Sequence, residues 1–222
     1  LLGAIGNLAL ALVIWSLRLN VAKSTTSSGS VLLQLHKGWA VIYDNSQVAR
    51  AFLLTAVFGF GGRAAVDLFP LFAANAFGRE ADAAGLLLSA AGLGSVCAAV
   101  YMALQKELPK HIAEYLCVVG IAALWLLPQT GFWLLGLVCA ATVGCAASIV
   151  GVANQAKIKL SIPDGFHGRI MGLWVMVGLG STALGTIAYG AISNHSTLRD
   201  ACALMSVIGI ICVLAILLES RE

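Results

Sequence analysis

Charged residues are scarce in this sequence of 222 residues, of which only 10% are Lys, Arg, Asp or Glu. A soluble domain carries about a quarter charged residues, because its surface faces water. Here the hydrophobic share is 60% and the mean hydropathy is +0.94. The scarcity of charge therefore argues against a soluble globular domain and predicts an integral membrane protein.

The sequence also lacks the common motifs of catalytic and metal sites. It contains no HExxH motif, no Walker-type phosphate loop and no paired catalytic carboxylates. Its six cysteines lie within apolar runs and match neither CxxC spacing nor a Cys/His metal pattern, so we expect them to be small packing residues. These absences favour a protein that is not an enzyme and that needs no metal or cofactor.

One enzyme class stays open as an alternative. Ser181 in "GLGST" and His195 in "SNHSTLRD" suggest an intramembrane serine protease, which needs a serine within reach of a histidine. The two residues are 14 positions apart, about 21 Å along a helix that rises about 1.5 Å per residue. We therefore expect them to lie too far apart for catalysis.

Long apolar runs predict membrane-spanning helices. A hydrocarbon core about 30 Å thick needs roughly 20 apolar residues. Helices are expected because lipid offers the backbone no hydrogen-bond partners, and the alternation typical of barrel strands is absent. The sequence thus predicts an all-α membrane protein. The candidate spans, of which the first is short, are 1–17, 51–77, 83–105, 112–128, 132–156, 170–193 and 201–218.

Basic residues are divided unevenly between the two ends of these runs. If successive runs cross in opposite directions, ten of the thirteen Lys and Arg fall on one side, Arg79 and Arg199 fall on the other, and Arg63 lies inside the membrane. Cytoplasmic loops are enriched in Lys and Arg, so we expect the richer side and the C-terminus to be cytoplasmic. The ten residues are Arg18, Lys23, Lys37, Arg50, Lys106, Lys110, Lys157, Lys159, Arg169 and Arg221.

The long connection 18–50 has two parts. "NVAKSTTSSGS" is typical of a flexible linker. After it, Leu32, Leu35, Trp39 and Ile42 recur at helical spacing, which predicts an amphipathic helix along the cytoplasmic interface. We interpret this helix as a structural connector rather than a regulatory element.

Two full charges lie inside the run 51–77. Arg63 is near its middle, where insertion of Arg or Asp costs about 2.5–3.5 kcal/mol each. Residues four apart share a helix face, so Gly59, Arg63 and Asp67 form one stripe in which the two charges can pair. Pro70 also lacks the N–H that would bond the preceding turn. This face must point into a bundle or a wet cavity.

Two interpretations of this stripe stay open. Arg63 and Asp67 are either an internal ion pair that fixes helix packing or part of a polar cavity for substrate and coupling ions. Ionisable residues within a membrane are functional candidates by default. Gly59, Arg63 and Asp67 are therefore the candidate substrate and coupling residues. In the functional interpretation, Asp67 exchanges its proton or its Arg63 partner as the cavity switches sides.

Small residues mark a candidate helix seam. Gly178, Ser181 and Gly185 share one face of the run 170–193. Helices in lipid approach closely where their facing residues are small. We therefore expect another helix to pack tightly against this face.

Polar residues near the cytoplasmic ends of two runs are weaker candidates. Asn154 and Gln155 lie where amide side chains can bond across helices. Glu114 either extends toward the interface or pairs with Lys110, four residues before it. Of these, only Gln155 recurs in the resemblance described next.

The segment "QAKIKLSIPDGFHGRIMGLWVMVGLGSTALGTIAYGAIS" resembles a loop and helix in the C-terminal half of major facilitator superfamily exporters. The likeness is greatest to the branch of the enterobactin exporter, where the pattern is Q-x(7)-P-[DE]-x-x-R-G-R-V-x-[SG]-L. His167 stands where that pattern has the arginine before glycine. The matching residues are Gln155, Pro163, Asp164, Gly168, Arg169, Gly172 and Leu173.

A second segment, "LFPLFAANAFGREADAAGLLLSAAGLGSVCAA", is similar to that branch's L-x-P-x-[FL]-A segment and its G-x-[LY]-x-x-A-x-G-x-G helix. The loop "QKELPKH" departs from the superfamily signature G-x-x-x-D-[RK]-x-G-R and keeps only its basic character. The matching residues are Leu68, Pro70, Gly85, Ala90, Gly92 and Gly94.

The resemblance implies the six-helix bundle that forms the C-terminal half of a major facilitator fold, preceded by one further transmembrane helix. Residues 1–17 are then the truncated last helix of the N-terminal half, 18–50 the cytoplasmic linker with its amphipathic helix, and 51–222 the C-terminal bundle. The sequence opens within an apolar run, without methionine or a basic leader, as expected of a fragment that lacks the N-terminal half.

Such proteins transport by alternating access of two bundles around a site near the membrane midplane. The resemblance implies a secondary active transporter that exports a small molecule, such as a siderophore or drug, across the bacterial inner membrane by proton antiport. Its partners are then the substrate, protons, the lipid bilayer and the missing half, with no nucleic acid. A non-transporting membrane scaffold or assembly protein is the other alternative.

The resemblance also implies a cytoplasmic gate in the loop that follows the run 132–156. Charge pairs in such a gate hold the inward face shut in one state and release it in the other. The implied gate residues are Asp164, Arg169, Lys157, Lys159 and Gln155.

Overall fold

The computed structural model describes residues 38–39, 42–43, 45–79, 81–105, 109, 111–163 and 166–219. All of them belong to 34–222, one of two compact units of the chain, and the fold is described within that unit. Every regular element among these residues is a helix, which confirms the all-α prediction. The predicted span 1–17 and most of the predicted amphipathic helix lie outside the described residues.

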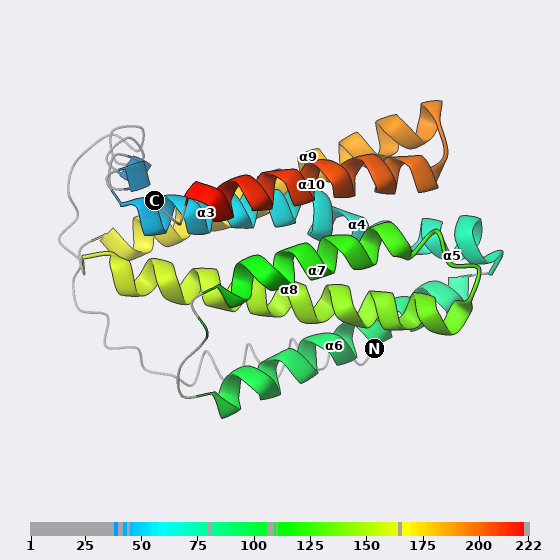
Figure 1. Ribbon diagram of the computed structural model, residues 1–222, viewed down its shortest axis with the longest axis horizontal. Helices are drawn as coiled ribbons and strands as arrows, with labels where there is room; N and C mark the ends of the chain where they lie inside the picture. Colours follow the sequence, from blue (N-terminus) through cyan, green and yellow to red (C-terminus); the bar gives the residue numbers. More distant parts are fainter. Residues whose placement is uncertain are drawn as a thin grey trace, which may run out of the picture. The chain divides into compact units, whose positions relative to one another are not determined.

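Five stretches of the described residues are long and apolar enough to cross a membrane: Ser46–Val66, Asp82–Leu104, Trp133–Ser161, His167–His195 and Leu198–Glu219. A shorter apolar helix covers Ile112–Leu126. The elements in Figure 1 are α3 (Ser46–Phe58), η1 (Gly59–Arg63), α4 (Ala64–Val66), α5 (Phe69–Phe77), α6 (Ala81–Leu104), α7 (Ile112–Leu126), α8 (Trp133–Ser161), α9 (His167–His195) and α10 (Leu198–Glu219).

The predicted helix over 51–77 is wrong as a continuous element. The chain becomes helical at Ser46, passes through the π-helical turn η1 and leaves the helix after Val66, before α5 starts at Phe69. Pro70 lies in the first turn of α5, where a missing N–H is tolerated. The interruption therefore falls where the sequence removes a backbone donor.

Local capping sets the ends of these segments. Asn45 precedes α3, and its Oδ1 accepts from the backbone N–H of Gln47 at 3.1 Å, while its Nδ2 donates to the Ser161 carbonyl at 3.2 Å. The side chain thus caps one helix and ties it to the end of α8. Gly78, with φ of 59°, ends α5 because a left-handed residue at that position suits glycine.

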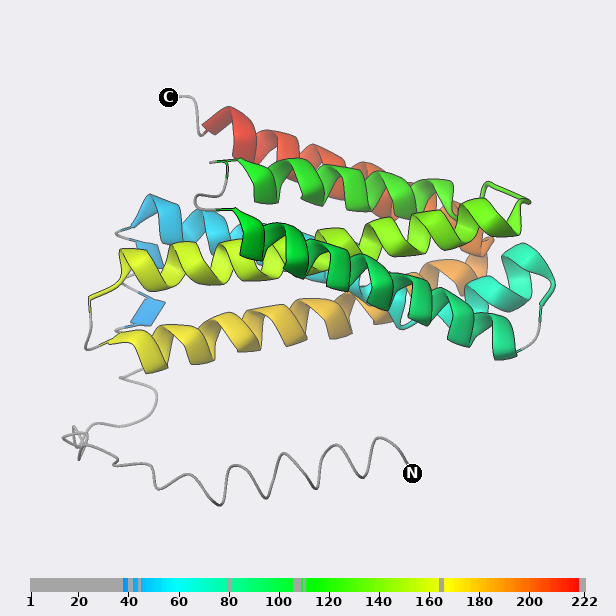
Figure 2. The ribbon, with the colours of Figure 1, turned by 90° about the horizontal axis from the view of Figure 1, so that it is seen from below.

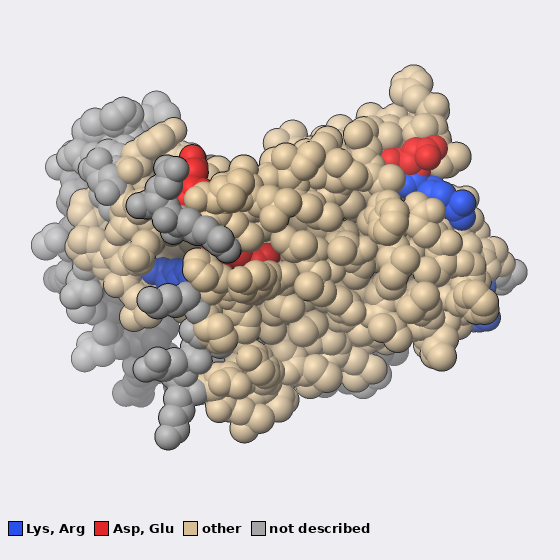
Figure 3. Space-filling model, viewed as in Figure 1, with Lys and Arg blue, Asp and Glu red and all other residues tan. Residues whose placement is uncertain are grey.

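Charged residues gather at the two ends of the helices. At one end, called the basic end from here on, Arg50 Nη2 donates to the Glu219 carbonyl at 2.8 Å and Lys157 Nζ lies 3.2 Å from Glu114 Oε1. At the opposite end, the Arg79 guanidinium lies 4.6 Å from the centre of the Trp133 ring. On the face in Figure 3 most of the described charges lie toward the two ends, and one acidic patch lies nearer the middle.

The helices pack around α8. Helices α3, α6 and α7 contact α8, while α9 contacts η1 and α3. Helix α10 runs beside α7 (Figure 2). The seam between α6 and α8 is very close, because a Cβ atom at Gly94 would collide with the Ala141 carbonyl and one at Gly144 with the Ala91 carbonyl. Small residues thus bring these two helices together, as expected in lipid.

This seam gives a first prediction. We expect Gly94→Ala to lower the apparent unfolding temperature, because the added methyl group meets backbone and overpacking costs about 1–3 kcal/mol. The matched control is Gly92→Ala on the same helix, where a Cβ atom has open space within 4 Å. Thermal unfolding in detergent compares the two variants. Equal melting temperatures would contradict the close seam.

Candidate functional site

A cavity of about 330 Å³ lies between α3, η1, α8 and α9. Gly59, Arg63 and Asp67, the three residues predicted for the substrate and coupling site, all line it. The structure therefore brings the predicted residues to one cavity. The remaining lining residues are Thr55, Phe58, Ala147, Val150, Gly151, Trp174, Val175, Gly178, Leu179 and Thr182.

The expected ion pair between Arg63 and Asp67 is not formed. Within the described part of the chain, the ion pairs within 4.0 Å are those of Glu114 with Lys157 and with His111. Arg63 and Asp67 are both exposed, and both line the cavity. Both charges therefore remain available to a molecule in the cavity.

The turn that carries Arg63 is a π-helix, which the sequence did not predict. Such wide turns are rare and often occur at functional sites. Gly59, Gly61 and Gly62 are all buried in it. The turn changes the register of the segment, so a side chain after it does not follow the face of α3. Arg63 is its last residue and Asp67 follows the short helix α4.

Helix α9 holds this π-helical turn with residues spaced four apart. A Cβ atom at Gly59 would collide with Ser181 Oγ, and one at Gly185 would collide with the Phe60 carbonyl. One turn further on, the Tyr189 hydroxyl donates to the Gly61 carbonyl at 2.9 Å in a buried position. The predicted close seam on the face of Ser181 and Gly185 is confirmed, and its partner is the π-helical turn.

Ser181 is used in this seam. Its hydroxyl donates to the Gly178 carbonyl of its own helix at 3.0 Å. His195 is the last residue of α9 and is exposed. The described contacts of Ser181 are therefore those of a packing residue.

A polar network joins α3, α8 and α9 beside the cavity. The Thr55 hydroxyl accepts from Trp174 Nε1 at 3.0 Å and from Asn154 Nδ2 at 3.2 Å, and donates to the Ala51 carbonyl at 2.7 Å. Asn154 is fully buried, and its Oδ1 has no hydrogen-bond partner among the described residues. The prediction that Asn154 bonds across helices is confirmed. Thr55 and Trp174 were missed, because neither forms part of a recognisable motif.

The predicted gate residues lie near the basic end. Gln155, Lys157 and Lys159 are in the last turns of α8, and Arg169 is in the first turn of α9, with its guanidinium 5.8 Å from the Phe166 ring centre. Asp164 lies outside the described residues. The structure thus brings four of the five residues to one end of the bundle.

Lys157 has a partner that the sequence did not indicate. Its Nζ lies 3.2 Å from Oε1 of Glu114, which is only 8% exposed. His111 Nδ1 is 4.0 Å from the same oxygen, and Glu114 Oε2 is buried without a hydrogen-bond partner among the described residues. Glu114 is therefore a buried carboxylate held by α8. Lys110, one of the two alternatives proposed for it, lies outside the described residues.

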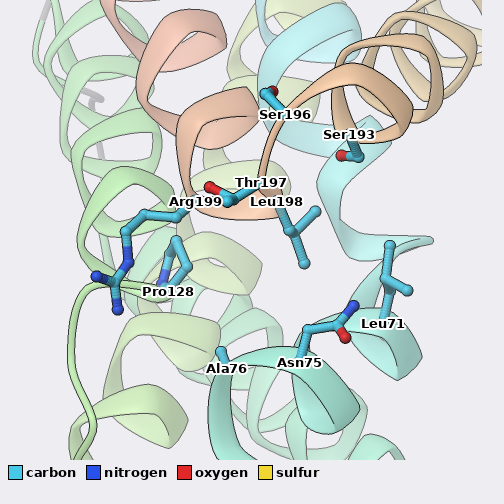
Figure 4. Close-up of a pocket in the computed structure, with 9 residues that line it drawn as sticks. All are labelled: Leu71, Asn75, Ala76, Pro128, Ser193, Ser196, Thr197, Leu198 and Arg199. Carbon is cyan, nitrogen blue, oxygen red and sulfur yellow. The ribbon is translucent and has the colours of Figure 1, made fainter.

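A second cavity, of about 530 Å³, lies at the end opposite the basic end. In Figure 4, Asn75 from α5 and Ser193 from α9 lie on one side of it, and Arg199 lies with Pro128 on the other. Ser193 Oγ is buried and has no hydrogen-bond partner in the described ranges. This cavity offers amide, hydroxyl and guanidinium groups where the helices end.

Comparison with protein-family models identifies a family. A family model described as transmembrane secretion effector, of the major facilitator type, matches residues 1–221. No curated protein and no solved structure matches the chain.

The polar network gives a second prediction. Thr55→Val keeps the shape of the side chain but leaves the N–H groups of Trp174 and Asn154 without an acceptor, at a cost of about 1–3 kcal/mol. We expect a lower apparent unfolding temperature and near-complete rescue by Thr55→Ser. Thr182→Val, which removes a hydroxyl that bonds only within α9 at 2.9 Å, is the control in the same cavity. If both valine variants melt alike, the network does not hold the helices.

The buried carboxylate gives a third prediction. Lys157→Met leaves the Glu114 carboxylate with His111 Nδ1 at 4.0 Å but without its lysine. Breaking a buried pair costs about 3–5 kcal/mol, and we expect a smaller loss here because the Lys157 side chain is 32% exposed. The double variant Glu114→Gln with Lys157→Met removes that charge and should recover most of the loss. Thermal unfolding of the single and double variants measures the coupling. Additive losses would show that the pair is not a unit.

Proposed function

Because this chain belongs to the transmembrane secretion effector family of the major facilitator superfamily, we propose that it exports a small molecule across the bacterial inner membrane by proton antiport. It is a transporter of the major facilitator type. Its likeness to the enterobactin-exporter branch supports a siderophore or a drug-like molecule as substrate. In this proposal the N-terminal half of the transporter faces the cavity of the 51–222 bundle.

The observation that carries the proposal is the cavity shared by Arg63 and Asp67. Arg63 lies near the end of the candidate span Ser46–Val66, and Asp67 directly follows that span. A charge at the centre of a span costs about 2.5–3.5 kcal/mol. An internal ion pair would lower that cost, but the two side chains line the cavity without pairing. A transporter gives such charges ligands that come and go, namely a proton for the carboxylate and anionic groups for the guanidinium.

The proposed cycle uses Asp67 as the proton carrier. In one state the ionised Asp67 accepts a hydrogen bond from the substrate, while Arg63 holds an acidic or polar group of it. When the cavity opens to the acidic side of the membrane, Asp67 takes up a proton and loses this contact with the substrate, and the substrate leaves. The return to the other side releases the proton. One proton moves inward for each binding event, and no covalent bond changes.

The charged and polar residues near the basic end form the proposed gate. Arg169, Lys159 and Gln155 lie there, and Asp164 joins them by resemblance. Lys157 supports the proposed gate indirectly, because its ion pair with Glu114 fixes the end of α8 against α7. We assign the basic end to the cytoplasm because the excess of Lys and Arg lies on that side.

The fourth prediction tests Asp67 as the proton carrier. In proteoliposomes containing the full-length transporter, we expect Asp67→Asn to lower export driven by a pH gradient by at least about a hundredfold, the lower end of the contribution typical of a positioned proton-transfer group. Export of a panel of siderophores and amphipathic dyes is measured with and without the gradient. Asp82→Asn, on an exposed carboxylate that accepts from the Ala83 N–H at 2.8 Å, is the matched control.

Three outcomes would contradict this function. Gradient-driven export that survives Asp67→Asn would remove Asp67 from coupling. The non-transporting scaffold would be favoured by two results together. The parent protein would export nothing, and replacement of both Arg63 and Asp67 by leucine would change only the stability of the protein. A serine-directed probe that labels Ser181 would instead favour the protease.

A further inference from the structure

A third cavity, of about 920 Å³, opens at the basic end between α3, α6, α7, α8 and α10. It is separate from the cavity of Arg63 and Asp67, since its wall contains no residue of η1 or α9. Its ionisable lining residues are Arg50, His111, Glu114 and Lys157. The proposed transport cycle uses neither Arg50 nor His111.

The charges in this wall leave a positive excess. The Glu114 carboxylate is matched by Lys157 at 3.2 Å. Arg50 bonds the neutral Glu219 carbonyl at 2.8 Å, and no acidic side chain within the described part of the chain forms an ion pair with it. A guanidinium has five N–H donors, so Arg50 keeps most of them for another acceptor. The cavity is thus prepared for an anion.

Apart from Gln47 and Gln105, the rest of the wall is apolar and continues along the membrane spans. Met102 from α6 and Val152 and Leu160 from α8 line the cavity. Val152 is 50% exposed and Leu160 is 89% exposed, so this side of α8 is open to a further apolar molecule. A soluble anion needs no such wall, whereas a phospholipid places its phosphate beside basic residues and its acyl chains beside apolar ones.

The location also fits a lipid. Arg50 lies in the first turns of the span Ser46–Val66 and Lys157 in the last turns of Trp133–Ser161, so both lie where helices leave the hydrocarbon. Basic pockets between helices at this level bind anionic headgroups. We propose that this cavity binds an anionic phospholipid, whose phosphate contacts Arg50 beside the Lys157–Glu114 pair and whose acyl chains lie along α6 and α8.

The test is retention of short-chain phosphatidylglycerol by the full-length protein in native mass spectrometry, with phosphatidylcholine as the zwitterionic comparison. We expect preferential retention of phosphatidylglycerol and a loss of about fivefold with Arg50→Gln, the effect of one basic residue at a lipid surface. Arg50→Lys should restore part of it. Lys159→Gln, on an exposed lysine two positions from Lys157 and outside the cavity wall, should change retention less than about twofold.

Three outcomes would overturn the proposal. Equal retention of the two lipids would exclude selection by charge. An equal loss with Lys159→Gln would show a general effect of surface charge. Displacement by inorganic phosphate alone would identify a site for soluble anions. Thermal unfolding of Arg50→Gln checks that this variant is folded. Export is measured in a separate assay, so that failure of the proposed transport cycle and failure of the lipid site give different results.

Discussion

The backbone of the π-helical turn Gly59–Arg63 must find its hydrogen bonds inside the protein, because lipid offers none. Helix α9 meets this constraint. Tyr189 donates to the Gly61 carbonyl, while Gly185 and Ser181 lie directly against Phe60 and Gly59. If α9 did not offer these contacts, a regular α-helix would be the more stable form of Gly59–Arg63. Arg63 and Asp67 would then take different positions relative to the cavity. The site therefore depends on a helix that carries none of its charges.

Helices α3, α8 and α9 supply the hydrogen bonds that support the wall of the cavity. Thr55 accepts hydrogen bonds from both α8 and α9, so one hydroxyl fixes two neighbouring helices to α3. Both donors are rigid planar groups with few torsions, and holding them costs little conformational entropy. The wall formed by Trp174 is thereby fixed, whereas the charged side chains of the cavity are left without internal partners.

Much of the fold follows from local sequence. The 20-residue apolar runs, the small-residue face of α9 and the charges at 63 and 67 are all visible in short windows, and the structure places them as helices, as a seam and in one cavity. The contacts that could not be predicted from the sequence join residues far apart along the chain. Lys157 and Glu114 are 43 residues apart, and Trp174 and Thr55 are 119 apart. Periodicity describes one helix at a time and gives no partner on another.

The charges along the helices fall into two groups, one paired within the protein and one exposed to a cavity without an ion pair. Glu114 is 8% exposed and has its cation at 3.2 Å, so the protein itself supplies the compensation and the pair holds α7 to α8. Arg63 and Asp67 are exposed to their cavity and compensated by nothing in the described residues. A charge that the fold has neutralised contributes to structure. Arg63 lies near the end of the span Ser46–Val66 and Asp67 follows it, and in the proposed function the substrate and a proton are their external partners.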